Sequence, residues 1–332
     1  MPRYRLTIAY DGTDFVGWQK QSASPETGEI PRDNSHDEHE GPVARAMPPA
    51  PPARAELRSV QGVVEQAVRE TVRQPIVLIG ASRTDSGVHA RFQTAAFTMQ
   101  EQTTADGRRI GPPDDRLMEA INSRLPADVL VTSCVPVEPA FDPIKDCLCK
   151  GYRYSLWVSP QRPLWEREQV WHQRGPLDVD AMAHAARLIE GTHDFGAFAA
   201  AGHGRESTVR TVLGCRAARG AGELVEIDVA ADGFLWNMVR IIAGTLVDVG
   251  RGKLAPSDIP GIIESKDRRR AGATAPARGL CLMWACYPED KLDALPDLVR
   301  ARVSVIESRR ENALAARRER SSRPAPLAGD AP

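Results

Sequence analysis

The sequence predicts an α+β protein made of two halves, each presenting a mostly antiparallel sheet with helices packed against it. Short runs that alternate apolar and polar residues indicate strands, and apolar residues at helical spacing indicate helices. In the first half these elements follow the order of a ferredoxin-like, split β-α-β unit. The second half repeats this order without a visible sequence repeat, so the duplication is inferred from the order of elements alone.

The first half, residues 1–138, begins with an alternating run from Arg3 to Tyr10 that predicts a strand. Valines and alanines at helical spacing from Val60 to Val72 predict a helix, with Ser59 as its N-cap. The remaining predicted elements of this half are strands at 76–79 and 92–99, a helix from about Asp114, and a strand at 129–137.

Residues 24–56 interrupt this half and have a different composition. They contain seven prolines and seven acidic residues but few large apolar ones, which predicts a disordered insertion. His36, Asp37, Glu38 and His39 lie inside it and would be a conceivable metal site. A solvated polar tract is the favoured interpretation, because nothing nearby would hold such ligands rigid, and no metal is expected.

The second half, residues 139–290, is predicted to contain both strands and helices. The strands are expected at 152–158, 211–218, 224–230 and 280–287, and the helices at 179–189, 234–249 and 256–263. Asp178 is the predicted cap of the first of these helices. Residues 291–332 form a basic tail that we expect to be disordered and at most partly helical. A supplementary RNA contact is the alternative role for this tail.

Composition limits the classes of function. The chain has 332 residues, 42% of them hydrophobic, so a sizeable core is possible. The net charge of −1 gives no global field for nucleic acid, so any RNA surface must be a local patch. No apolar run is long enough to span a bilayer, and no signal peptide is visible. We therefore expect a cytoplasmic location, no membrane contact and reduced thiols at the six cysteines.

The segment from Gly80 to Ala90 is the strongest candidate for a chemical site. It places Asp85 in a tight loop between two predicted strands, with Arg83 two positions before it and Gly87 two positions after it. Loops held by a rigid sheet often carry functional groups. Taken alone, the same residues also describe an ordinary turn in which Asp85 bonds its own backbone.

A family resemblance favours the interpretation of Asp85 as a functional residue. Residues 83–90 match every fixed position of RTDxGVHA, the signature of the TruA family of tRNA pseudouridine synthases, whose indispensable aspartate would be Asp85. Residues 10–19, which contain YDGT and FxGWQ, resemble the N-terminal signature of this family, although we expect Phe15 and Trp18 to be core residues. Residues 59–62 resemble the TVQG start of the first helix of the family.

Two further motifs of the second half resemble the same family. Residues 150–154, KGYRY, make Tyr152 the tyrosine that lies on the target uracil; two strand aromatics that fill the core are the alternative. Residues 234–246 resemble FLxxMVRxIxGTL and contain Arg240 on a strongly apolar helix. A buried arginine needs an anionic partner, and the expected partner is Asp85. The alternative for Arg240 is a side chain that reaches the surface. Residues 141–144 depart from the FHAR of many members, which puts substrate contacts there in doubt.

The resemblance implies isomerisation of uridine to pseudouridine in the tRNA anticodon stem-loop, at positions 38–40, by a homodimer. It implies one continuous mixed sheet with a central, positively charged cleft. Asp85 would be the catalytic nucleophile, with Tyr152, Arg83 and Arg240 as substrate-binding residues. Arg83 would fill the space that the extruded base vacates or clamp a phosphate. Isomerisation needs neither electrons nor an energy source, so no cofactor is expected.

A non-catalytic tRNA-binding or RNA-folding protein of the same fold is the alternative function. The joint presence of Asp85, Tyr152 and Arg240 argues against it, because binding alone would not need that carboxylate. A generic RRM-like binder is a third possibility, but the chain lacks the aromatic pair of an RNP motif.

Overall fold

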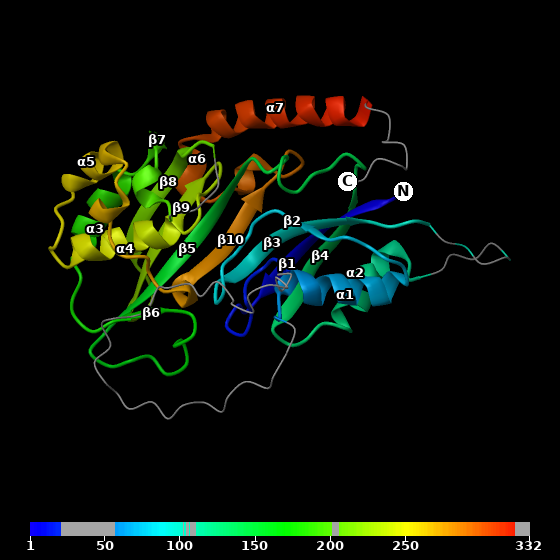
Figure 1. The fold of residues 1–332 in the computed structure, drawn as a ribbon, viewed down its shortest axis with the longest axis horizontal. Helices are drawn as coiled ribbons and strands as arrows, with labels where there is room; N and C mark the ends of the chain where they lie inside the picture. Colours follow the sequence, from blue (N-terminus) through cyan, green and yellow to red (C-terminus); the bar gives the residue numbers. More distant parts are fainter. Residues whose placement is uncertain (21–56, 102, 104–105, 107–110, 201–205, 323–332) are drawn as a thin grey trace, which may run out of the picture.

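The computed structural model describes residues 1–20, 57–101, 103, 106, 111–200 and 206–322. These residues form one ten-stranded, mostly antiparallel mixed sheet with seven α-helices (Figure 1). The predicted α+β class with one mixed sheet is confirmed at this level. The predicted insertion at 24–56, with its histidine pair, lies outside the described residues, as do residues 323–332. In the part of the chain that is described, no helix is long and apolar enough to cross a membrane.

The strand order shows how distant parts of the chain meet. All pairs are antiparallel except β3–β10 and β5–β6. The sheet runs β4 (Val129–Val137), β1 (Arg3–Tyr10), β3 (His89–Thr98), β10 (Leu280–Cys286), β5 (Cys149–Val158), β9 (Leu224–Ala231), β8 (Val209–Arg219) and β7 (Gly191–Asp194). Two short strands lie off this path, β2 (Ile79–Gly80) beside β3 and β6 (Trp171–Gln173) beside β5.

The β3–β10 pair, which we call the seam, joins strands from the first 137 residues to strands from residue 149 onward. It has only two registered pairs, His89 with Cys281 and Ala90 with Leu282. Strand β3 starts at His89, directly after the loop that carries Asp85. The topology therefore places this loop at the seam.

The helices of the main core gather in two groups (Figure 1). Helices α1 (Val60–Val72) and α2 (Leu117–Asn122) lie near β1 and β4, whereas α3 (Val179–Arg187), α4 (Met238–Gly250) and α5 (Asp258–Ser265) lie near β5, β8 and β9. Side chains of β5 alternate, so Tyr152 and Tyr154 point into this core while Arg153 points to the opposite face. The main core thus lies on the face of the sheet that carries Tyr152.

Local sequence signals account for several element boundaries. The Ser59 hydroxyl accepts a hydrogen bond from the Gly62 N–H at 3.2 Å, and the Asp178 carboxylate accepts one from the Ala181 N–H at 2.9 Å. Both predicted caps are confirmed. The predicted helix start at residue 234 is wrong, because α4 begins at Met238. Asn237 precedes it with φ of 59°, a left-handed conformation that breaks the helical path.

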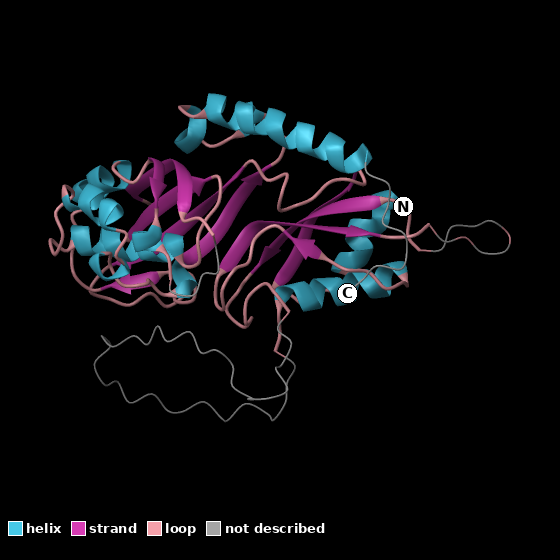
Figure 2. Ribbon diagram, turned by 45° about the horizontal axis from the view of Figure 1, so that its top comes forward, coloured by secondary structure: helices cyan, strands magenta, loops and turns pink. Residues whose placement is uncertain are grey.

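The tail, which we predicted to be solvated and partly helical, contains helices up to residue 322. Residues 297–300 form α6 (Asp297–Arg300) and residues 303–322 form α7 (Val303–Ser322), which lies apart from the helices of the main core (Figure 2). Ile306 of α7 packs with Leu148 in a separate apolar cluster.

Arginines of α7 explain why this basic helix is ordered. Arg317 is only 3% exposed, and its Nε donates to Oδ2 of the fully buried Asp146 at 3.0 Å. Arg309 Nε donates to the Leu148 carbonyl at 2.8 Å. Several of the arginines that suggested a solvated tail therefore attach the helix to the body of the protein.

Candidate active site

The loop between β2 and β3 is held by the segment that follows β1. The Trp18 N–H donates to the Thr84 carbonyl at 3.0 Å, and the Tyr10 hydroxyl lies 2.7 Å from Thr84 Oγ1. Gly17 has φ of +110°, and a Cβ atom there would lie 2.5 Å from the Thr84 carbonyl oxygen. Only glycine permits this approach. As predicted, Phe15 and Trp18 are buried in the core.

A second set of bonds fixes the far side of the loop. The Ser86 hydroxyl and the Gly87 N–H both donate to the Phe15 carbonyl, at 3.1 and 3.3 Å. The Val88 N–H donates to the Asp85 carbonyl at 3.2 Å, which closes the turn around Asp85. The backbone of Asp85 is thus held on both sides, so the direction of its side chain is set by the fold.

The Asp85 carboxylate meets one side chain from the turn before α4 and one from the first turn of α4. Arg240 Nη1 lies 3.2 Å from Asp85 Oδ2, and Trp236 Nε1 donates to Asp85 Oδ1 at 3.1 Å. The predicted pairing of Arg240 with Asp85 is confirmed. The two residues are 155 positions apart in the sequence and come from opposite sides of the seam.

Burial is unequal across this ion pair. The Arg240 side chain is 1% exposed, whereas the Asp85 side chain is 29% exposed. Arg240 is satisfied further by the Ala275 carbonyl, which accepts from Nε at 2.7 Å, and by Asn237 Oδ1, which accepts from Nη1 at 2.9 Å. The arginine is therefore a fixed, buried cation, and the carboxylate it holds stays open to a ligand.

Tyr152 lies on the sheet face that carries the main core and is buried in the main apolar cluster, as the core-packing alternative predicts. Its ring meets Phe234 edge-on, with centroids 5.1 Å apart and planes at 89°. Burial raises the pKa of the Tyr152 phenol strongly; a hydrogen bond with Ser82 opposes this rise, and the charge of Asp85 adds to it. The phenol therefore stays neutral at physiological pH. Lys150 Nζ donates to Ser82 Oγ at 2.8 Å, which ties the base of the Asp85 loop to β5.

Arg83 is the one predicted site residue that does not join this cluster. Its side chain is exposed and makes no hydrogen bond or ion pair with the residues that the structure describes. It lies two positions before Asp85 in the same loop, and its exposed cationic end is available to a ligand.

Known proteins resemble this chain over most of its length. A family model described as tRNA pseudouridine synthase matches residues 185–288, which include Trp236 and Arg240. The chain is 38% identical over 287 residues to tRNA pseudouridine synthase A of Pelobacter propionicus, covering 86% of this chain and 100% of that protein. It is 39% identical over 302 residues to the protein of the same name from Solidesulfovibrio magneticus, covering 90% and 96% of the two chains. The chain belongs to the tRNA pseudouridine synthase A family. The corresponding protein of Moorella thermoacetica is 38% identical over 282 residues, covering 85% of this chain and 98% of the relative.

Two parts of the cluster were not identified as functional from the sequence. Trp236 lies within the motif that resembles the TruA family, at a position which that motif leaves variable, so no role was assigned to it. The contact of Lys150 with Ser82 joins β5 to the Asp85 loop across 68 positions, which no local pattern reveals. A basic residue two positions before Tyr152 was the one available signal for this contact.

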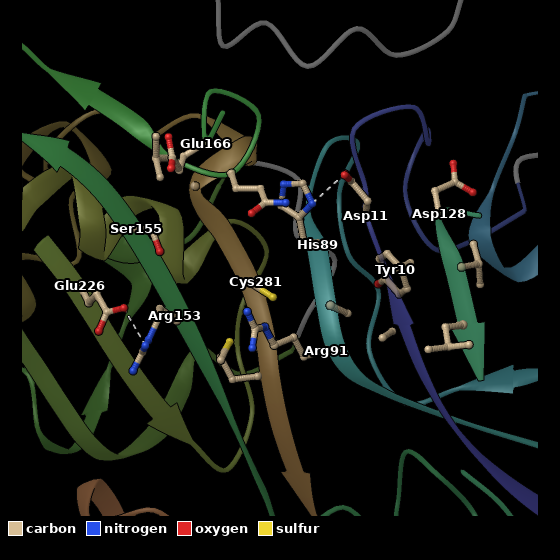
Figure 3. A pocket seen from close by; sticks show the side chains of 18 of the residues that line it. Tyr10, Asp11, His89, Arg91, Asp128, Arg153, Ser155, Glu166, Glu226 and Cys281 are labelled. Carbon is tan, nitrogen blue, oxygen red and sulfur yellow. Dashed lines mark hydrogen bonds and ion pairs between the residues drawn. The ribbon is translucent and has the colours of Figure 1, made fainter. Parts of the chain in front are cut away.

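A cavity of about 490 Å³ lies on the opposite face of the sheet (Figure 3). Arg153 and Glu226 line it and form an ion pair at 2.7 Å. Because Arg153 and Tyr152 are neighbours in β5, their side chains point to opposite faces, so this cavity does not open onto Asp85. His89, from the TruA signature, also lines it, with Nδ1 3.1 Å from Asp11 Oδ1. His89 links the start of β3 to the residues around this cavity.

Proposed function

We propose that this chain isomerises uridine to pseudouridine in tRNA, with Asp85 as the catalytic nucleophile. The observation that carries the proposal is the unequal ion pair, in which a buried Arg240 holds a carboxylate that remains partly exposed. The names of the full-length relatives, tRNA pseudouridine synthase A, give the substrate class and the reaction.

The reaction breaks the N1–C1′ bond and forms a C5–C1′ bond, while a proton leaves C5 and N1 gains one. All atoms and electrons of the nucleoside are conserved. A carboxylate is suited to form a transient covalent bond in such a reaction. Arg240 and Trp236 hold one carboxylate oxygen each, which supports a fixed direction of attack.

The target uridine must leave the base stack to reach Asp85, at a cost of a few kcal/mol. In the proposal, Tyr152 stacks on the extruded uracil and remains a neutral phenol because burial raises its pKa. Arg83 fills the vacated space or binds a phosphate, which its exposure and lack of protein partners among the described residues support.

The proposal extends to the architecture around Asp85. We assign residues 1–138 and 139–290 to two ferredoxin-like halves, because the strand orders β4-β1-β3-β2 and β10-β5-β9-β8 follow the same pattern. A positively charged tRNA cleft would lie between the halves at the seam, where Arg83 and Lys150 flank the Asp85 loop. Action at positions 38–40, a homodimer and a cytoplasmic location complete the proposal as properties of the family.

The decisive experiment compares the purified chain with its Asp85→Asn variant on an unmodified tRNA transcript. We expect the parent to form pseudouridine in the anticodon stem-loop, detected by mapping modified positions, and Asp85→Asn to form none. The Asp85→Asn protein should still bind the transcript, because the substitution keeps the shape of the side chain. Pseudouridine formation by Asp85→Asn at the parental rate would refute the nucleophile role. Binding without turnover by the parent would favour a non-catalytic tRNA-binding protein.

A further inference from the structure

Trp236 has features that core packing does not explain. Its side chain is 49% exposed, although the residues on either side of it, Leu235 and Asn237, lie in a tightly structured turn. It is absent from the apolar clusters that form the core of the described residues. Its side chain donates a hydrogen bond from Nε1 to Asp85 Oδ1, at 3.1 Å.

We propose that Trp236 is a positioning residue that sets the plane of the Asp85 carboxylate for the reaction. This inference rests on the proposed function. The torsion that turns an aspartate carboxylate about its Cβ–Cγ bond is broad and weakly restricted. A single donor, such as Arg240 on Oδ2, therefore leaves the carboxylate free to rotate about that contact. A second donor on Oδ1 removes this freedom.

The backbone around Trp236 supports this role. The Ala200 N–H donates to the Trp236 carbonyl at 3.1 Å, which fixes the residue from one side. Asn237 follows in the left-handed conformation, with φ of 59°, and so reverses the chain direction immediately before α4. A non-glycine residue in this conformation is uncommon and is often found at functional sites. The turn at Asn237 thus lets Trp236, which precedes α4, and Arg240, in the first turn of α4, reach the same carboxylate.

The chemistry of the indole fits positioning and no other task at Asp85. An indole N–H donates but does not accept, and it does not ionise in the physiological range. Trp236 therefore neither exchanges a proton with Asp85 nor adds a second charge beside Arg240. If Trp236 acts through Asp85, its removal should slow the step that Asp85 performs and leave the tRNA Kd nearly unchanged. Folding should also be nearly unchanged, because the ring is not part of the core.

The test measures single-turnover pseudouridine formation, tRNA Kd and Tm for Trp236→Phe and Trp236→His. Phe keeps an aromatic ring but has no donor, and we expect its single-turnover rate to fall about 10- to 100-fold, with Kd within twofold of the parent. His restores an N–H donor, and the single-turnover rate of Trp236→His should be at least threefold higher than that of Trp236→Phe. Trp165→Phe is the matched control, because Trp165 is 84% exposed and makes no hydrogen bond to Asp85 in the described part of the chain.

Each outcome decides the proposal. A Trp236→Phe rate within twofold of the parent overturns it, as does a slow rate that Trp236→His fails to improve. A loss explained by weaker tRNA binding, or by unfolding of both variants, also overturns it, since Trp236 would then serve binding or stability. If the parent itself forms no pseudouridine, the proposed function fails and this inference falls with it. An active parent with unaffected variants refutes the inference alone.

Discussion

Replacing Arg240 with lysine tests the centre of the proposed site. Contacts of the arginine reach the Ala275 carbonyl from Nε, and Asn237 and Asp85 from Nη1. A lysine ammonium is a single point donor and does not reproduce the planar fork that spans these three acceptors. We expect Arg240→Lys to fold but to lose about 100-fold in kcat, because the Asp85 carboxylate shifts from its fixed position.

Replacing Arg240 with alanine measures how much the ion pair with Asp85 contributes to the free energy of unfolding. Breaking a fully buried ion pair costs about 3–5 kcal/mol. Asp85 is 29% exposed and is rehydrated when its partner is lost, so we expect the lower end, about 3 kcal/mol. In a chain of this size each kcal/mol shifts the Tm by about 2 °C, so Arg240→Ala should melt roughly 6 °C lower.

Tm by calorimetry and kcat on an unmodified tRNA transcript measure the two effects separately. Arg251→Lys is the matched control, because Arg251 directly follows the same helix and its guanidinium contacts Gln173, away from Asp85. This control should keep its kcat. A kcat for Arg240→Lys within threefold of the parent would refute the reasoning, since the fork geometry would then be irrelevant to Asp85.

Three further predictions concern stability. Replacing residues 24–56 with a short linker should leave the Tm unchanged, because the flanks are already joined by the Val60 N–H to Gly17 carbonyl bond at 3.1 Å; a large drop in Tm would show that the segment packs against the body. Arg317→Ala should lower the free energy of unfolding, measured in urea, by about 3 kcal/mol, because the buried Asp146 loses a partner. The control Arg318→Ala, at an exposed position, should change it very little. Equal losses would contradict the attachment of α7 through Arg317. Burial raises the pKa values of Tyr10 and Tyr152 in the folded state. Their contribution to stability is therefore complete below about pH 10 and is lost as the pH rises further. A Tyr10→Phe variant whose Tm falls as steeply as that of the parent above pH 10 would contradict this.

Much of the fold was predictable where the pattern is local and one face is buried. The strands Arg3–Tyr10 and Val129–Val137 have their predicted bounds, because alternation marks a half-buried strand directly. The strands β6 and β7 were missed, since Trp171–Gln173 has three residues and Gly191–Asp194 is polar. Segments this short have no periodicity to detect.

Contacts between residues that are far apart in the sequence could mostly not be predicted from it. Arg317 is 171 positions from Asp146, so a basic run that looks solvated in the sequence becomes buried only in the folded chain. The pairing of Arg240 with Asp85 was predictable because each residue lies in a motif that resembles the same family. The contact of Trp236 with Asp85 was not predictable, because it depends on the left-handed turn at Asn237. Asparagine permits this conformation, but its presence in a sequence does not predict it.

Because the site spans the seam, it is incomplete while the chain is still being synthesised. A ribosome delivers Asp85 well before Tyr152, Trp236 and Arg240. Domains can begin to fold during synthesis, with N-terminal parts first. A nascent chain therefore carries the carboxylate without the residues that aim it, and in the proposed mechanism it has no activity toward RNA. In the proposed mechanism, activity requires both sides of the seam, where β10, the last strand in the sequence, pairs with β3.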